Sequence, residues 1–177
     1  MKKVLCTLIL VLTIVTTLSN SVLAYTPATR TNNGFILESE PNDYPEDATI
    51  LWKTSTGIYT CTGGIPYIED TDSYVYQCET TRTRTLSVYS STPLRDTDAE
   101  LYVCLVDLAT DQVLYEGSVP ASGPISANIK TFTAIAGHDY LVNIGLQGST
   151  DAIQAKLDYY VEHTTRNQGY TYTVQCQ

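Results

Sequence analysis

Apolar and polar residues alternate along most of the chain, from Gly57 to the C-terminus. A period of two places neighbouring side chains on opposite faces of a β-strand, so each alternating segment predicts a strand. The segments are rich in Tyr, Val, Ile, Thr and Leu, which pack well on a half-buried pleated surface. We expect strands over residues 57–61, 73–79, 84–90, 99–107, 112–117, 125–134, 139–146, 153–162 and 169–176.

Turn-forming residues separate these segments, for example Thr62-Gly63-Gly64 and Ala121-Ser122-Gly123-Pro124. Many short strands with frequent turn signals favour an all-β fold, either a sandwich or a barrel. No segment after residue 37 shows a sustained apolar stripe of helical period. The one helical turn that we expect lies within Glu46–Lys53, after Pro45.

The N-terminus has the pattern of an export signal. Two lysines precede a long apolar run from Val4 to Leu18, and small residues end the segment at Ala24. We interpret residues 1–24 as a signal peptide, residues 25–37 as a flexible leader and residues 38–177 as one domain. The protein is therefore expected to be secreted, extracellular and free of the membrane after cleavage. A retained anchor is the alternative, although the run is shorter than the ~20 residues of a spanning helix.

The charge of the chain limits its partners. The formal net charge is −9, and loss of residues 1–24 removes two lysines, which leaves 8 − 19 = −11. A charge of this sign repels nucleic acids and anionic membranes and suits cations. The sequence therefore predicts no nucleic-acid partner.

Four cysteines remain after residue 24: Cys61, Cys78, Cys104 and Cys176. An even number in an exported protein predicts two disulfides, with three pairings left open. A zinc site is the rival interpretation, but there is no C-x-x-C motif. Strand alternation places Cys104 on an outer face, opposite to Leu101, Val103 and Leu105.

Two acidic segments indicate a cation site. The first is Glu38-Ser39-Glu40-Pro41-Asn42-Asp43, and the second is Glu69-Asp70-Thr71-Asp72, just before an expected strand. Calcium takes six to eight oxygen ligands and tolerates irregular geometry. Without a cation, such carboxylates raise one another's pKa values. A solvated turn is the alternative for the first segment, since Pro, Asn and Asp all favour turns.

These segments resemble the bacterial pre-peptidase C-terminal domain family, which includes the collagen-binding domains of clostridial collagenases. The resemblance covers about residues 36–175 and rests on four elements in order. The first three are Glu38-Ser39-Glu40-Pro41-Asn42-Asp43, Asp70-Thr71-Asp72-Ser73-Tyr74 and Asp96-Thr97-Asp98-Ala99-Glu100-Leu101. The fourth is a closing pair of segments, Ala136-Gly137-His138-Asp139-Tyr140 and Gly169-Tyr170-Thr171-Tyr172. The four cysteines depart from the usual pattern of the family.

The resemblance implies a jelly-roll-like antiparallel β-sandwich that binds calcium, as some family members do. Carried over by position, the calcium ligands would be Glu38, Glu40, Asn42, Asp43, Asp70 and Asp72. Two interpretations stay open for Asp96 and Asp98: they form a further ion site, or they accept hydrogen bonds at the start of a strand.

The chain has 14 tyrosines. Tyr74, Tyr76, Tyr140, Tyr170 and Tyr172 are expected in the core. Exposed tyrosines are common where proteins bind partners, and the collagen-binding relatives use such a face. Our candidate binding face consists of Tyr89, Tyr102, Tyr115 and Tyr159. Tyrosines scattered over an ordinary sandwich are the alternative.

The sequence lacks the nucleophile elbow, the H-E-x-x-H motif and the phosphate-binding glycine loop, so we expect a protein that is not an enzyme. The leading hypothesis is a secreted calcium-binding module that binds an extracellular matrix protein or polysaccharide. A structural or chaperone-like accessory to another exported protein is the second hypothesis, and a small hydrolase is the third.

Overall fold

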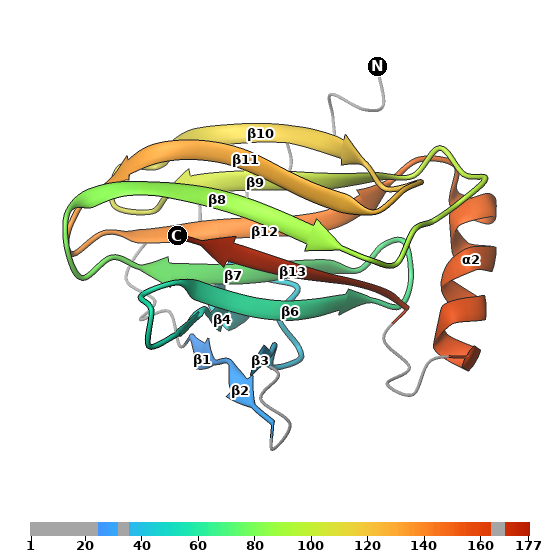
Figure 1. The fold of residues 1–177 in the computed structure, drawn as a ribbon, viewed down its shortest axis with the longest axis horizontal. Coiled ribbons are helices and arrows are strands. Elements are labelled where there is room, and N and C mark those ends of the chain that lie inside the picture. Colours follow the sequence, from blue (N-terminus) through green and yellow to red (C-terminus); the bar gives the residue numbers. More distant parts are fainter. Residues whose placement is uncertain (1–24, 32–35, 164–168) are drawn as a thin grey trace.

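The chain folds into two β-sheets packed face to face, with one helix at an end of the sandwich (Figure 1). The computed structural model describes residues 25–31, 36–163 and 169–177. The predicted signal peptide, residues 1–24, lies outside the described residues. Within them, no helix is long and apolar enough to cross a membrane.

Sheet A has the strand order β1-β4-β7-β12-β9-β10. Its strands are β1 (Thr26–Pro27), β4 (Thr49–Ile50), β7 (Thr71–Gln77), β12 (Asp139–Gln147), β9 (Glu100–Asp107) and β10 (Gln112–Pro120). Sheet B has the order β11-β8-β13-β6-β3-β2, and β5 also pairs with β6. Its strands are β11 (Ile125–Ala134), β8 (Arg82–Ser90), β13 (Tyr170–Cys176), β6 (Tyr59–Ile65), β3 (Ile36–Leu37), β2 (Thr29–Arg30) and β5 (Trp52–Lys53).

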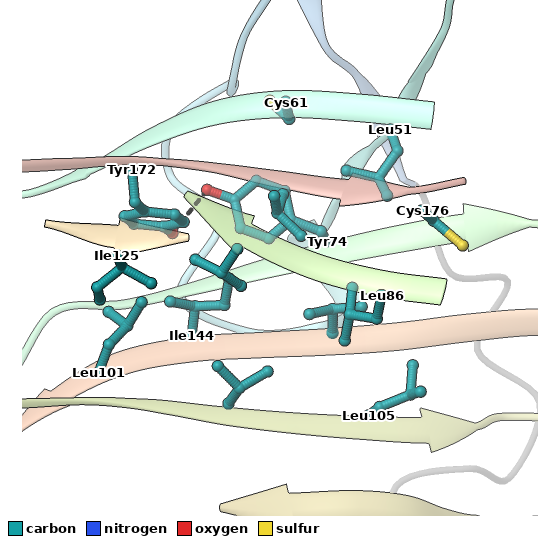
Figure 2. Packing of buried hydrophobic residues seen from close by; sticks show 14 of the residues in the cluster. Leu51, Cys61, Tyr74, Leu86, Leu101, Leu105, Ile125, Ile144, Tyr172 and Cys176 are labelled. Carbon is teal, nitrogen blue, oxygen red and sulfur yellow. Dashed lines mark hydrogen bonds between the residues drawn. The ribbon is translucent and has the colours of Figure 1, made fainter. Parts of the chain in front are cut away.

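The alternating pattern produces the core, as the sequence predicts. In β13, Tyr170, Tyr172, Val174 and Cys176 are buried, whereas the residues between them are half-buried. Side chains from both sheets meet in one cluster, and Figure 2 shows Leu86 and Tyr172 of sheet B with Leu101, Leu105 and Ile144 of sheet A. All five tyrosines expected in the core are buried there. The all-β sandwich is confirmed.

The N-terminal part refines the predicted topology. The long strands pair antiparallel, but β1 with β4, β4 with β7 and β3 with β6 pair parallel, so both sheets are mixed. Within the predicted flexible leader, the described residues form the short strands β1, β2 and β3, which pair within the two sheets. The helical turn expected over Glu46–Lys53 is present only at its start, in the 3-10 helix η1 (Pro45–Asp47), because Thr49–Ile50 and Trp52–Lys53 form the short strands β4 and β5.

The strand predicted over residues 153–162 is wrong, because Thr150–His163 forms helix α2. Ile153 and Leu157, four residues apart, are buried, whereas Ala155 is exposed. The apolar residues of this segment alternate as in a strand, but good helix formers such as Ala, Leu, Gln and Lys favour the helix, in which only Ile153 and Leu157 are buried. Asp98 fixes the start of the helix by accepting hydrogen bonds from Ser149 N and Ser149 Oγ, both 2.8 Å long. Of the two alternatives for Asp98, its hydrogen-bonding role is therefore the one observed, at the start of α2.

The expected pair of disulfides is also wrong. Cys61, Cys78, Cys104 and Cys176 are all free and buried. The first, second and fourth belong to the main core between the sheets, whereas Cys104 packs in a second cluster with Val75 and Leu141. Sheet A therefore separates Cys104 from the other three thiols, so two bridges cannot form.

The helix assignment makes a prediction that a strand would not. Leu157→Ala removes a fully buried side chain and should lower the free energy of unfolding by about 2–5 kcal/mol. Ala155→Glu should change it by less than about 0.5 kcal/mol, since this position faces solvent. In a strand, residues 155 and 157 would share one face, and both changes would be severe. Urea denaturation of the two variants measures the difference.

Candidate metal centre

The first acidic segment connects the two sheets. Glu38 follows β3, and its N–H donates to the Thr62 carbonyl of β6 in sheet B, at 3.3 Å. Four residues later, the Asn42 carbonyl accepts a hydrogen bond of 2.9 Å from Ser73 N of β7 in sheet A. The segment therefore crosses from one sheet to the other, next to the second acidic segment.

Three of the predicted ligands converge. Oxygen atoms of Glu38, Glu40 and Asp72 all lie within 4.8 Å of one another. Asp72 is fully buried because it precedes Tyr74 and Tyr76 by two and four residues on the inward face of β7. Glu40 is exposed, so the group opens to solvent on one side.

Asn42, also fully buried, lies among these three carboxylates. Its side-chain Nδ2 donates to Glu40 Oε2 at 2.9 Å and to Asp72 Oδ1 at 3.2 Å, and its backbone N–H donates to Glu40 Oε2 at 3.2 Å. Glu38, Glu40, Asn42 and Asp72 thus form one group, which we call the inner site.

The remaining two predicted ligands form an adjacent pair. Asp43 lies close enough to Asp70 to help raise the pKa of the Asp70 carboxyl group, after burial and Glu40. Asp70 is 4% exposed, and its Oδ2 atom is buried with no hydrogen-bond partner. An unpartnered buried carboxylate oxygen is unfavourable, and it is an available ligand for a cation.

Two buried tyrosines donate hydrogen bonds to the inner site from its core side. Tyr74 donates to Glu38 Oε2, Tyr172 donates to Asp72 Oδ2, and the two hydroxyl groups lie 2.8 Å apart. Figure 2 shows this tyrosine pair, which joins β7 of sheet A to β13 of sheet B. The chain of four oxygens has three links but only two phenolic protons, so it is complete only when one carboxyl group carries a proton.

Gly63 of β6 makes room for this chain. A Cβ atom there would lie 2.6 Å from Glu38 Oε2 and 2.7 Å from the Tyr172 hydroxyl, and closer still to the Tyr74 hydroxyl. The adjacent Gly64 N–H donates to Glu38 Oε1 at 2.8 Å. Backbone without a side chain is therefore required where the carboxylate enters the core.

Burial raises the carboxyl pKa values at the site. Desolvation, with a further contribution from Glu40, raises the pKa of Glu38 to about 8, although its hydrogen bond from Tyr74 opposes the shift. Desolvation, Glu40 and Asp43 raise the pKa of Asp70 to about 7. The pKa of Asp72 is raised well above its usual value, first by desolvation and then by Glu38.

No basic side chain neutralises these groups among the described residues, whose ion pairs are Lys53–Glu79 and His138–Asp107. Clustered oxygen donors, an unpartnered buried oxygen and the absence of a basic partner fit a hard divalent cation such as calcium.

The sequence did not identify the residues that support or border the site. Tyr74 and Tyr172 were expected as core residues, and nothing in the pattern marks Gly63 as more than a turn former. Tyr67, 46% exposed, borders the site, because its carbonyl accepts a hydrogen bond of 3.1 Å from Asp70 N. Tyr44, 62% exposed, directly follows Asp43. Exposed aromatic residues inside turns have no periodic signal.

The four tyrosines of the candidate binding face lie on different surfaces. Tyr102 packs on the outer side of sheet A with the Cys104 cluster, and Tyr115 packs against the main core. Tyr89 alternates with buried Val88 and Ser90 on the outer side of sheet B, and Tyr159 is exposed on α2. The structure does not bring them together, and a binding role for any of them stays a prediction.

Comparisons with known proteins give distant structural similarities. No protein-family model matches the sequence, and a search of curated proteins finds no match. A solved pre-peptidase C-terminal domain of a collagenase from Bacillus anthracis is similar over 77% of this chain and 100% of that chain, with 17% identity and a TM-score of 0.45.

Two other solved structures are similar at a lower TM-score. PliG from Salmonella Typhimurium, a periplasmic inhibitor of g-type lysozyme, matches 71% of this chain and 91% of its own, with 15% identity and a TM-score of 0.35. A GH26-CBM35 mannanase from Podospora anserina matches 74% of this chain but 23% of its own, with 14% identity and a TM-score of 0.35. At these values the role of the site has to be argued from its own residues.

The raised carboxyl pKa values predict an unusual pH dependence when divalent cations are chelated. Folded carboxyl groups with raised pKa values bind protons that the unfolded chain releases, so stability is present at low pH and lost as pH rises. The free energy of unfolding should fall between about pH 4.5 and pH 8, by up to about 1.4 kcal/mol per pH unit for each titrating group.

Urea denaturation in chelator across this range measures the slope. Glu38→Gln, which keeps an acceptor for Tyr74 and Gly64, should flatten the profile. A free energy of unfolding that rises from pH 5 to pH 8 would contradict the assignment.

Proposed function

We propose that this chain is a secreted β-sandwich module that binds calcium at the inner site and uses the surface beside it to bind an extracellular macromolecule. The observation that carries the proposal is the inner site itself: three carboxylates within 4.8 Å of one another, with no basic partner among the described residues. Glu38, Glu40, Asn42 and Asp72 would hold the ion, with Asp43 and Asp70 adjacent.

The location of the site favours a structural consequence of binding. The segment from Glu38 to Asp43 follows strands β1, β2 and β3, and it is hydrogen-bonded to β6 of sheet B through Glu38 and to β7 of sheet A through Asn42. Neutralising the carboxylates on this segment removes their mutual repulsion where both sheets meet. Calcium would therefore stabilise the attachment of the N-terminal strands to the sandwich.

The surface beside the site has the character of a binding surface. Tyr44 and Tyr67 are two of the large apolar side chains that the fold leaves exposed. Tyrosine provides a rigid amphipathic contact that is enriched where proteins bind partners. A matrix protein or a polysaccharide offers the apolar faces and hydroxyl or amide groups that such a surface takes. The proposed role needs no catalytic group.

Thermal melting tests the calcium site. Extracellular calcium modules bind with Kd values of about 10⁻⁴–10⁻³ M. At 10 mM calcium and a Kd of ~10⁻⁴ M, binding to the folded state adds about 2.7 kcal/mol, which raises Tm by about 5–10 °C over chelator.

Asp72→Asn should abolish this rise and leave the chelated protein as stable as the wild type or more so, because a buried charge has been removed. Glu116→Gln, on β10 and outside the site, should keep the full response. Equal melting curves with calcium and with chelator would refute the proposed site.

Co-sedimentation with insoluble collagen, cellulose or chitin tests the macromolecular partner. We expect retention on one of the three in calcium and weaker retention in chelator. The double variant Tyr44→Ala/Tyr67→Ala should lose at least tenfold in affinity, because its contact surface is removed. Tyr159→Ala, an equally exposed tyrosine on α2, is the matched control and should bind normally. Retention that depends on Tyr159 instead would place the binding surface elsewhere.

A further inference from the structure

Asn42 stands apart from the other residues of the inner site because its side chain can present either an acceptor or a donor. Its backbone is fixed on both sides, by the bond from its N–H to Glu40 Oε2 and by the bond from Ser73 N to its carbonyl. The side chain is fully buried among Glu38, Glu40 and Asp72. A half turn of the terminal amide exchanges its oxygen and nitrogen, which have nearly the same size.

The two amide orientations suit two different states of the site. With the amide oxygen toward Glu40 and Asp72, Oδ1 would lie 2.9 Å from Glu40 Oε2 and 3.2 Å from Asp72 Oδ1, and Nδ2 would face Glu38 Oε2 at 3.4 Å. Three oxygens then face one another, which is repulsive alone but favourable around a divalent cation. After a half turn, Nδ2 donates to both Glu40 Oε2 and Asp72 Oδ1. These are charge-assisted hydrogen bonds, the stronger kind.

We propose that Asn42 turns its amide by half a rotation between the empty and the loaded site. In the empty site, the NH2 group bridges Glu40 and Asp72 and takes the place of the missing positive charge. In the loaded site, the amide oxygen faces the ion and the NH2 group returns toward Glu38. This inference rests on the proposed calcium site, and it assigns Asn42 a second role in the protein without calcium.

The inference explains why an amide suits this position better than a carboxylate. An aspartate at residue 42 would be an equal or better ligand for calcium, but it has no N–H to donate. It would add a further buried charge to the empty site. The amide therefore weakens calcium binding, since two hydrogen bonds are given up on loading, and in return it stabilises the fold when calcium is scarce.

Two variants separate this role from simple packing. Asn42→Asp should lower Tm in chelator and should bind calcium at least tenfold more tightly, so that calcium restores its Tm. Asn42→Leu, similar in volume, should lower both the Tm in chelator and the calcium affinity, with no rescue by calcium. Equal stability of Asn42→Asp and wild type in chelator would overturn the inference.

The direct test is NMR of the uniformly ¹⁵N-labelled wild-type protein, titrated with calcium chloride. The Asn42 NH2 signals, assigned by their loss in Asn42→Asp, should lie downfield in chelator and move upfield with calcium. The NH2 signals of Asn128, which accepts from Ser87 Oγ on sheet B at 2.8 Å, should stay in place.

The outcomes are distinguishable. Shifts in the backbone signals of residues 38–43 and 70–73 without a change in the Asn42 NH2 signals would overturn the amide rotation and leave the calcium site standing. Unchanged backbone and side-chain signals would overturn both the calcium site and the rotation.

Discussion

The placement of carboxylates between two β-sheets is the constraint on which the rest of the structure depends. Glu38 and Asp72 enter the sandwich from opposite sheets, where burial disfavours their charged forms. Tyr74 and Tyr172 give each carboxylate one hydrogen bond, and Gly63 leaves room for the four groups. These contacts position the negative charge without neutralising it. Under the proposed function, a cation would take the place of the protons that these carboxyl groups otherwise bind.

The fold makes the core side of the site rigid and leaves the opposite side open to solvent. Asp72, Tyr74 and Tyr172 stand on long central strands, which keep their geometry through the sheet hydrogen bonds. Glu38, Glu40 and Asn42 belong instead to the segment that joins the first short strands to the sandwich. A bound cation would connect the segment after β3 to the central strand β7. Ion binding would therefore be linked to the order of the N-terminal strands and to the shape of the surface near Tyr44 and Tyr67.

Much of this arrangement could be predicted from the sequence. Period-two alternation located most of the long strands and the five core tyrosines, and the two acidic segments contained every residue of the inner site. Contacts between distant segments could not be predicted, because alternation gives the face of a side chain but not its partner on the other sheet. Helix α2 was missed because Ile153, Ala155, Leu157 and Tyr159 alternate as in a strand, whereas only Ile153 and Leu157 are buried. The free cysteines were missed because their number says nothing of the sheet that separates Cys104 from the others.

The most direct test of the account is a crystal structure grown in calcium, with a second crystal soaked in a lanthanide to locate the ion by anomalous scattering. The account predicts one peak within about 2.3–2.6 Å of oxygen atoms from Glu38, Glu40, Asn42 and Asp72. It also predicts that Tyr74 and Tyr172 still donate to the first and last of these. An inner site that holds only water, with its carboxyl groups protonated and hydrogen-bonded to one another while the ion binds elsewhere, would contradict it.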